Sequence, residues 1–209
     1  MTRLRWGTNV PTDTAAARER LVDAAEGCID RFGVAKTTLE DVAKAADVSR
    51  ATVYRYFRNR DELMLAVILR ELDRSYEQSL DDFAGAVRTP EEAARAIVDA
   101  AVYLLETIRS NPKLQLFLDT EGAAAINGAS EAFFAAVAED LRPYLEPAQA
   151  AGAIRPELDV LEMVEWILRT ILSLLTVAGP VRRTSEDERR YLATYLVPAL
   201  VPGPTTVTN

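Results

Sequence analysis

A short segment near the N-terminus carries side chains that can contact nucleic acid. Residues 50–57 read RATVYRYF, and Arg50, Thr52 and Tyr54 bring hydrogen-bonding groups to the first turns of a helix. An arginine can bind guanine through two hydrogen bonds, and methyl groups such as those of Ala51 and Thr52 can contact thymine. We therefore expect Arg50, Ala51, Thr52 and Tyr54 to contact base edges of a DNA duplex.

A second set of polar side chains surrounds this segment and suits phosphate groups better. Contacts to phosphates fix the register of a protein on DNA but read no sequence. Hydroxyl and cationic groups make such contacts, and the neighbouring candidates are Thr38, Lys44, Ser49, Tyr56, Arg58 and Arg60. For each residue of both sets, a solvated surface side chain without a DNA contact remains the alternative.

Two short helices separated by a tight turn would position these groups. The first is expected over Leu39–Ala46, where Thr38 can cap the helix and Asp41 can complete a capping box. Ser49 can cap the second, over Arg50–Phe57. Small apolar residues supply a shared core: Val42, Ala43, Val48 and Val53. This arrangement predicts a helix-turn-helix whose second helix enters the major groove.

A resemblance to a known family extends over residues 32–67, which read FGVAKTTLEDVAKAADVSRATVYRYFRNRDELMLAV. The run resembles the DNA-binding domain of the TetR family of bacterial transcription regulators. It matches in segment order, in the Thr-Thr pair before the first helix and in the aromatic ending of the second. One position departs, because Asp47 stands in the turn where the family commonly has glycine. Aspartate tolerates a left-handed backbone better than most residues, so we expect the turn to be kept.

Capping signals predict an all-α chain of about nine helices. Beyond the helix-turn-helix pair, the first four expected helices cover Thr14–Phe32, a stretch from behind Asn59 to about Ala84, a stretch from Thr89-Pro90 to about Arg109, and a short helix after Asn111-Pro112. The next covers Ala129–Glu146 and ends near Pro143 and Pro147. The last two are a helix capped by Asp159 that lasts to about Ala178, and one capped by Ser185 with Glu188 that ends near Pro198. We assign residues 1–60 to an N-terminal arm and DNA-binding domain, 61–201 to a helical effector-binding and dimerisation domain, and 202–209 to a flexible tail.

The charge distribution agrees with a DNA-binding N-terminus. The chain has a net charge of −8, but residues 1–60 hold 11 Lys and Arg against 8 Asp and Glu, so they carry +3 and the remainder carries −11. The positive charge gathers where phosphates would lie.

The same composition argues against an enzyme. The chain has no histidine and a single cysteine, Cys28, which leaves few options for acid–base catalysis or a metal site. We expect no cofactor, no metal, no membrane segment, and a cytoplasmic location in which the lone cysteine stays reduced.

The resemblance implies a two-fold dimer on a palindromic operator. The helix expected over 160–178 is apolar on two faces, so we expect the body to cover one face and a partner chain the other. The candidate interface residues are Leu161, Val164, Leu168, Ile171, Leu172, Leu175, Tyr191, Tyr195 and Leu196. A deeply buried core helix in a monomer is the alternative.

The resemblance also implies a small-molecule effector held by the helical body. Its candidate contacts are Leu104, Phe117, Asp119, Glu121, Phe133, Phe134, Met163 and Trp166, although each could simply belong to the core. A carboxylate among apolar neighbours needs a partner, so the expected effector is mostly apolar and can include one polar or basic group. Glu165 has a nearer partner in Arg169, one turn on.

These observations predict a ligand-responsive transcriptional regulator, in the form of a repressor that binds double-stranded DNA as a homodimer and is released by its effector. The alternative is a helical small-molecule carrier or adaptor that kept the fold without specific DNA binding.

Overall fold

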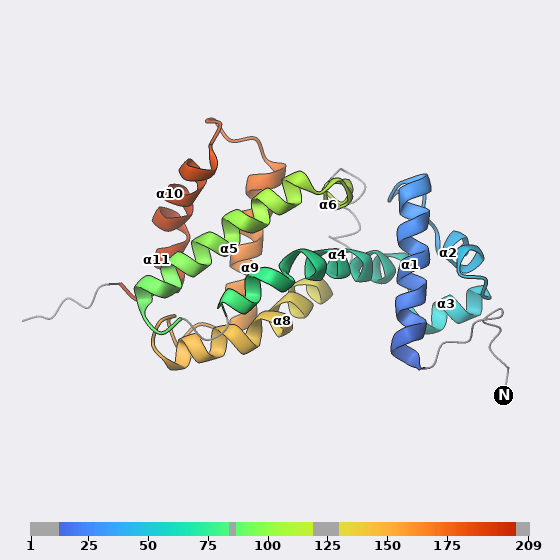
Figure 1. Ribbon diagram of the computed structural model, residues 1–209, viewed down its shortest axis with the longest axis horizontal. Helices are drawn as coiled ribbons and strands as arrows, with labels where there is room; N and C mark the ends of the chain where they lie inside the picture. The colour runs from blue at the N-terminus through green and yellow to red at the C-terminus, as the bar shows by residue number, and fades with distance from the viewer. Residues whose placement is uncertain (1–12, 84–86, 119–129, 204–209) are drawn as a thin grey trace, which may run out of the picture. The chain divides into compact units, whose positions relative to one another are not determined.

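The computed structural model describes residues 13–83, 87–118 and 130–203, and within these ranges the chain is helical with no strand. It divides into two compact units. The first unit comprises Met1–Leu72 and Lys113–Ser130, and the second comprises Asp73–Pro112 and Glu131–Asn209. Figure 1 shows the helices of each unit. The all-α architecture predicted from the sequence is confirmed.

The first unit begins with three helices whose ends follow the predicted caps. Helix α1 covers Thr14–Phe32 and ends at Gly33, whose φ of 83° suits glycine. Helix α2 covers Leu39–Ala45, and helix α3 covers Arg50–Tyr56. Each of the last two starts behind a side chain that accepts a backbone N–H. Thr38 and Asp41 form the expected capping box, and the Ser49 hydroxyl lies 3.1 Å from the backbone nitrogen of Thr52.

A small apolar core joins α1, α2 and α3. Val42, Val53 and Phe57 are fully buried there, and Ala43 is nearly so. Val48 is only half-buried, so it contributes less than expected. The small side chain of Ala43 agrees with a close approach of α2 and α3, which pack on each other. The packing leaves the opposite side of α3 open.

The turn between α2 and α3 is closed by a left-handed residue. Asp47 has a φ of 54°, as expected for a position where the family commonly has glycine. The backbone N–H of Val48 donates to the Ala43 carbonyl at 2.9 Å, and that of Asp47 donates to the Lys44 carbonyl at 3.2 Å. This pair of bonds is a Schellman motif. Arg20 of α1 donates to the Ala46 carbonyl at 2.9 Å, so α1 also holds the end of α2.

Helix α4, over Arg60–Phe83, is joined to α1 by Arg70, whose side chain is 13% exposed. Arg70 donates to Glu26 at 3.1 Å, to Glu19 at 3.1 Å and to Asp23 at 2.7 Å. Burial lowers the pKa of Arg70, but the hydrogen bonds to Glu26 and Glu19 outweigh it, so the pKa lies above its ordinary value. These hydrogen bonds join α1 and α4 within the first unit, which extends to Leu72.

The second unit packs its helices around α5, which covers Pro90–Ser110. Helix α9 covers Val160–Thr176, α10 covers Ser185–Tyr195 and α11 covers Val197–Leu200, and all three contact α5 (Figure 1). Helix α5 starts with a capping box of Thr89 and Glu92, and α9 starts behind Asp159, as predicted.

Helix α8, over Ser130–Ala150, runs through the two prolines that were expected to end it. Pro143 and Pro147 cannot donate to the carbonyls of Glu139 and Pro143. Glu139, Pro143 and Pro147 are exposed, so water can satisfy the two carbonyls. Leu145, between the prolines, is buried and keeps the helix on the core. The prediction of an earlier end near Glu146 was therefore wrong.

The cap of α10 also differs from the prediction. Thr184, one residue before the predicted Ser185, caps the helix, and Asp187 completes the capping box. The hydrogen bonds from Thr184 hold the pKa of Asp187 at about 2, below its usual value. Ser185 instead donates to Glu106 of α5 at 2.6 Å. Glu188, expected in the cap, is buried with 3% of its surface exposed.

Glu188 has a cationic partner on α5. Arg109 donates to its two carboxylate oxygens at 2.8 and 2.7 Å, and this bidentate pair joins α10 to α5. The hydrogen bonds that Arg109 donates to Glu188 raise the pKa of Arg109 above its ordinary value. A buried carboxylate is tolerated only while such a partner is present.

The left-handed turn leads to a first prediction. Asp47→Val should lower the free energy of unfolding of the first unit by about 1–2 kcal/mol, because a left-handed backbone is strained for a β-branched residue. Asp47→Gly should change it by less than about 1 kcal/mol, since glycine adopts positive φ freely. Urea unfolding followed by circular dichroism measures both variants. Equal destabilisation by valine and glycine would contradict the role given to the turn.

The Arg109–Glu188 pair leads to a second prediction. Arg109→Ala should destabilise the protein by about 3 kcal/mol, because it leaves a buried carboxylate unpaired. The matched control is Arg142→Ala on α8, whose partners Glu139 and Glu146 are exposed. That change should cost less than about 1 kcal/mol in the same urea experiment. Similar losses from the two variants would show that burial of Glu188 does not decide the effect.

Candidate nucleic-acid interface

Three of the four residues expected at base edges lie on the open side of α3. Arg50 and Ala51 are exposed in its first turn, and Tyr54 is 55% exposed. Thr52 is different, with only 2% of its surface exposed and its hydroxyl 2.9 Å from that of Ser49. The structure thus leaves Arg50, Ala51 and Tyr54 accessible to a ligand and packs Thr52 inward.

Most residues expected at phosphates are also accessible. Thr38 and Ser49 are exposed at the starts of α2 and α3, and the side chains of Lys44 and Arg58 are 72% and 90% exposed. The Tyr56 hydroxyl accepts a hydrogen bond from Arg55 at 2.6 Å.

Arg60 differs from this set because its guanidinium is used inside the unit. Its Nε donates to the Thr37 carbonyl at 2.9 Å, and a second nitrogen donates to the Val34 carbonyl. Both carbonyls belong to the loop between α1 and α2. Arg60 therefore ties this loop to the start of α4, and a cation at the end of a helix-turn-helix sequence need not face the duplex.

The exposed cations Arg55 and Lys36 were not among the expected DNA contacts. Arg55 is exposed on α3, with its guanidinium 4.7 Å from the centre of the Tyr56 ring. Lys36 is exposed in the loop between α1 and α2. A signal for Arg55 was present, because it follows Ala51 by four residues and such residues share a helix face. Lys36 lies in a loop, where helical spacing offers no guide.

One carboxylate lies among the exposed cations. Glu40, near the start of α2, forms an ion pair with Arg50 and lies 3.7 Å from the Lys44 nitrogen. Its neighbour Asp41 is engaged differently, since it accepts from the Thr38 hydroxyl at 2.6 Å and from the Thr38 backbone at 3.1 Å. These bonds hold the pKa of Asp41 below its ordinary value.

The described residues among those expected around an effector belong to both units. Leu104, Phe133, Phe134 and Met163 are buried in the second unit, where the two phenylalanine rings lie 5.6 Å apart. Trp166 of α9 is 50% exposed. Phe117 belongs to the first unit, and Asp119 and Glu121 lie outside the described residues.

The local pairing suggested for Glu165 is present. Its carboxylate accepts from Arg169 at 2.7 Å, and the same guanidinium lies 5.3 Å from the centre of the Phe134 ring. Glu165 therefore needs no ligand to balance its charge.

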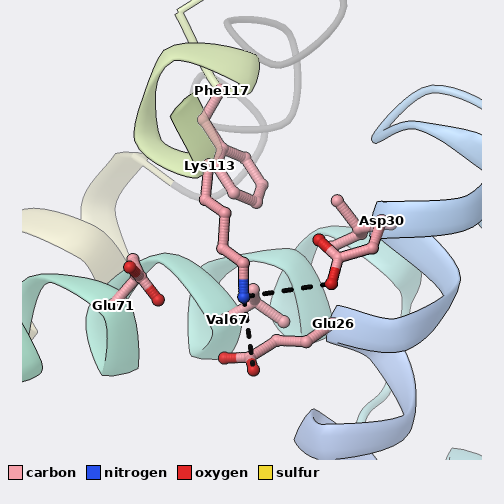
Figure 2. Close-up of a pocket in the computed structure, with 7 residues that line it drawn as sticks. Glu26, Asp30, Val67, Glu71, Lys113 and Phe117 are labelled. Atoms are coloured by element: carbon pink, nitrogen blue, oxygen red, sulfur yellow. Dashed lines mark ion pairs between the residues drawn. The ribbon is translucent and has the colours of Figure 1, made fainter. Parts of the chain in front are cut away.

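A shallow pocket in the first unit lies between α1, α4 and α6, the short helix over Pro112–Leu116 (Figure 2). Lys113 points toward α1, and its nitrogen lies 4.0 Å from carboxylate oxygens of both Glu26 and Asp30. The empty volume is about 230 Å³ with the solvent at its mouth included. Ligand sites occupy roughly 300–1,000 Å³, so this space is small for an effector. Of the expected effector contacts that the structure describes, only Phe117 lines it.

The expected dimer residues fall into two groups. Val164, Leu168, Ile171 and Leu196 are buried within a single chain, so they belong to its core. Leu161 is 40% exposed and Tyr195 is 66% exposed, whereas Leu172, Leu175 and Tyr191 are intermediate. Periodicity identified α9 as apolar on two faces but did not show which face the body covers.

Two further classes of site find no support in the part of the chain that the structure describes. No group of three or more acidic, cysteine or histidine side chains there could hold a metal ion. None of the helices found within these ranges combines the length and apolar character that a bilayer crossing requires.

Comparisons with known proteins identify the helix-turn-helix. Residues 21–67 match the model of the tetR family of bacterial regulatory proteins. The HTH-type transcriptional regulator Rv1255c of Mycobacterium tuberculosis is 32% identical to this chain over 193 residues, which cover 91% of this chain and 88% of the relative.

Solved structures of the same fold extend the likeness beyond the DNA-binding part. The repressor QsdR of R. erythropolis matches with a TM-score of 0.64 and 20% identity, covering 92% of this chain and 99% of QsdR. The repressor AlkX of Dietzia sp. matches with a TM-score of 0.62 and 19% identity, covering 91% of this chain and 97% of AlkX. Because the sequence relationship to the Mycobacterium regulator spans nearly the whole chain, this protein belongs to the tetR family of helix-turn-helix transcriptional regulators.

Proposed function

We propose that the protein is a cytoplasmic transcriptional repressor that binds a palindromic operator as a homodimer and leaves it when a small, mostly apolar effector binds. The observation that carries this proposal is the open face of α3, where Arg50, Ala51 and Tyr54 are exposed in the first two turns. Repression is the form of regulation that agrees with QsdR and AlkX, which share the fold and are repressors.

The proposed contacts follow from exposure and chemistry. Arg50, Ala51 and Tyr54 would read base edges, with Arg50 directed at a guanine. Phosphates would be bound at the N-terminal ends of α2 and α3, where Thr38 and Ser49 lie, and by the exposed cations Lys44 and Arg58. We leave Thr52 out of this set because its side chain is buried, and Arg60 because its guanidinium donates to two backbone carbonyls of the loop before α2.

Dimerisation would supply the second recognition helix. Apolar side chains that a single chain leaves partly exposed on α9 and α10 are the natural candidates for the interface, above all Leu161 and Tyr195. Since two-fold symmetry places the same patch on both chains, the operator would consist of two inverted half-sites.

An effector would act through the second unit. The N-terminal half of helix α4 belongs to the first unit and its C-terminal half to the second. A shift of the C-terminal half on effector binding would therefore move the N-terminal half, which is part of the DNA-binding unit. To move the protein from 99:1 bound to 1:99, the effector must favour the released form by about 5.5 kcal/mol. Unchanged operator affinity at a saturating effector concentration would contradict this switch while leaving DNA binding intact.

DNA binding is tested with two substitutions on α3. Arg50→Ala and Tyr54→Ala should each abolish specific operator binding without unfolding the protein, because a lost base contact costs about 1–3 kcal/mol in each of two half-sites. Mobility shifts with DNA from upstream of the protein's own gene, at two salt concentrations, measure the effect. The control is Arg182→Ala, which removes an exposed cation from the second unit. A wild-type protein that ignores every duplex would favour the carrier or adaptor.

The interface is tested by placing charge on it. Leu161→Arg and Tyr195→Arg should each weaken the dimer by about 3 kcal/mol or more, because a buried cation would lack a partner. Sedimentation velocity measures the fraction of dimer. The matched control is Leu116→Arg in the first unit, a leucine 37% exposed against 40% for Leu161. If all three variants remain dimeric, the interface lies elsewhere.

A further inference from the structure

Glu40 stands out within the proposed DNA-binding surface because each of its oxygens faces a cation. One oxygen pairs with Arg50, and the other lies 3.7 Å from the Lys44 nitrogen. All three side chains are accessible, with 43% of Glu40, 59% of Arg50 and 72% of Lys44 exposed. A carboxylate thus sits between the residue proposed to read guanine and one proposed to bind a phosphate.

Two other acidic residues near this surface accept hydrogen bonds from backbone N–H groups at the starts of helices, whereas Glu40 accepts none from the residues that the structure describes. Asp41 forms the capping box of α2. Glu62 accepts the backbone N–H of Arg58 at 2.7 Å before α4, and it also pairs with the Arg58 guanidinium at 3.3 Å. In the described part of the chain, the polar partners of Glu40 are the two cations. Its place in the first turn of α2 favours a negative charge slightly, and exposed ion pairs contribute little more, so its contribution to the fold is small.

A carboxylate at this place has a definite effect on DNA binding. The Glu40 carboxylate repels phosphates. If Arg50 and Lys44 bound the phosphate backbone instead, the charge of Glu40 would lose its two partners and lie close to the phosphates. Arginine, however, carries five N–H donors on a planar group. One edge of the Arg50 guanidinium can stay on Glu40 while another binds the two acceptors of guanine.

We propose that Glu40 is a specificity-determining residue that acts through Arg50. It holds the guanidinium for a guanine in the major groove, and it lowers the affinity for DNA that offers phosphates without that base. This role rests on the proposed function, because it requires that α3 reads DNA.

The test replaces Glu40 with glutamine, which keeps the size of the side chain and removes its charge. The probes are an operator fragment selected by the wild-type protein from genomic DNA and an unrelated duplex of equal length. For Glu40→Gln, affinity for the unrelated duplex at 0.15 M salt should rise about fivefold per subunit, and the slope of log affinity against log salt should steepen by about one per subunit. The ratio of operator to unrelated affinity should fall roughly tenfold.

A matched control separates this role from net charge alone. Glu146→Gln on α8 removes the same charge from an exposed ion pair with Arg142, 3.0 Å away, and should leave the ratio and the salt slope unchanged. In the Arg50→Ala background, Glu40→Gln should no longer change the ratio. Thermal unfolding followed by circular dichroism checks that each variant is folded.

The outcomes are distinct. An unchanged ratio for Glu40→Gln, or equal effects from Glu40→Gln and Glu146→Gln, would overturn the role of Glu40 while leaving DNA reading by α3 intact. A wild-type protein with equal affinity for all duplexes would instead overturn the proposed function, and the role of Glu40 with it.

Discussion

The recognition surface depends on how α2 ends. Two backbone hydrogen bonds and one left-handed residue, Asp47, reverse the chain within a few residues, so that α3 packs on α2 through buried Val53. Arg20 of α1 binds the Ala46 carbonyl and makes the same turn part of the three-helix core. The direction of α3, and therefore the face on which Arg50 and Tyr54 stand, follows from backbone hydrogen bonds in this turn and not from the side chains proposed to touch DNA.

Part of the positive charge of residues 1–60 serves the fold. Arg20 donates to a backbone carbonyl at the end of α2 and Arg60 to one in the loop before it, while Arg70, beyond this range, pairs with three carboxylates of α1. A net charge of +3 for residues 1–60 therefore does not measure the charge available to phosphates. The available cations are those whose side chains remain exposed, and two of them, Lys44 and Arg50, share Glu40. The positive charge that this surface can offer to phosphates is therefore smaller than the composition indicates.

Several features that depend on neighbours within four residues were predictable from the sequence, although the cap of α10 lies one residue earlier than expected. The caps at Thr38, Ser49 and Asp159 and the ends of α1 follow from such local signals. Features that depend on tertiary packing were not. Thr52 turns inward because α2 covers its side of α3, and Val164 and Leu196 face the body of their own chain. Periodicity marks an apolar face, but it does not distinguish a face covered by the same chain from one covered by a partner.

The size of α3 explains why a second copy matters for reading DNA. Its seven residues extend about 10 Å at 1.5 Å per residue, and successive base pairs are about 3.4 Å apart. One helix can therefore cover about three base pairs, and discrimination of about 1–3 kcal/mol per pair leaves a single copy with few specific contacts among millions of competing sites. A two-fold dimer doubles the contacts without a new recognition element. On this reasoning, the partly exposed apolar side chains of α9 and α10 matter to sequence recognition as much as Arg50 and Tyr54 do.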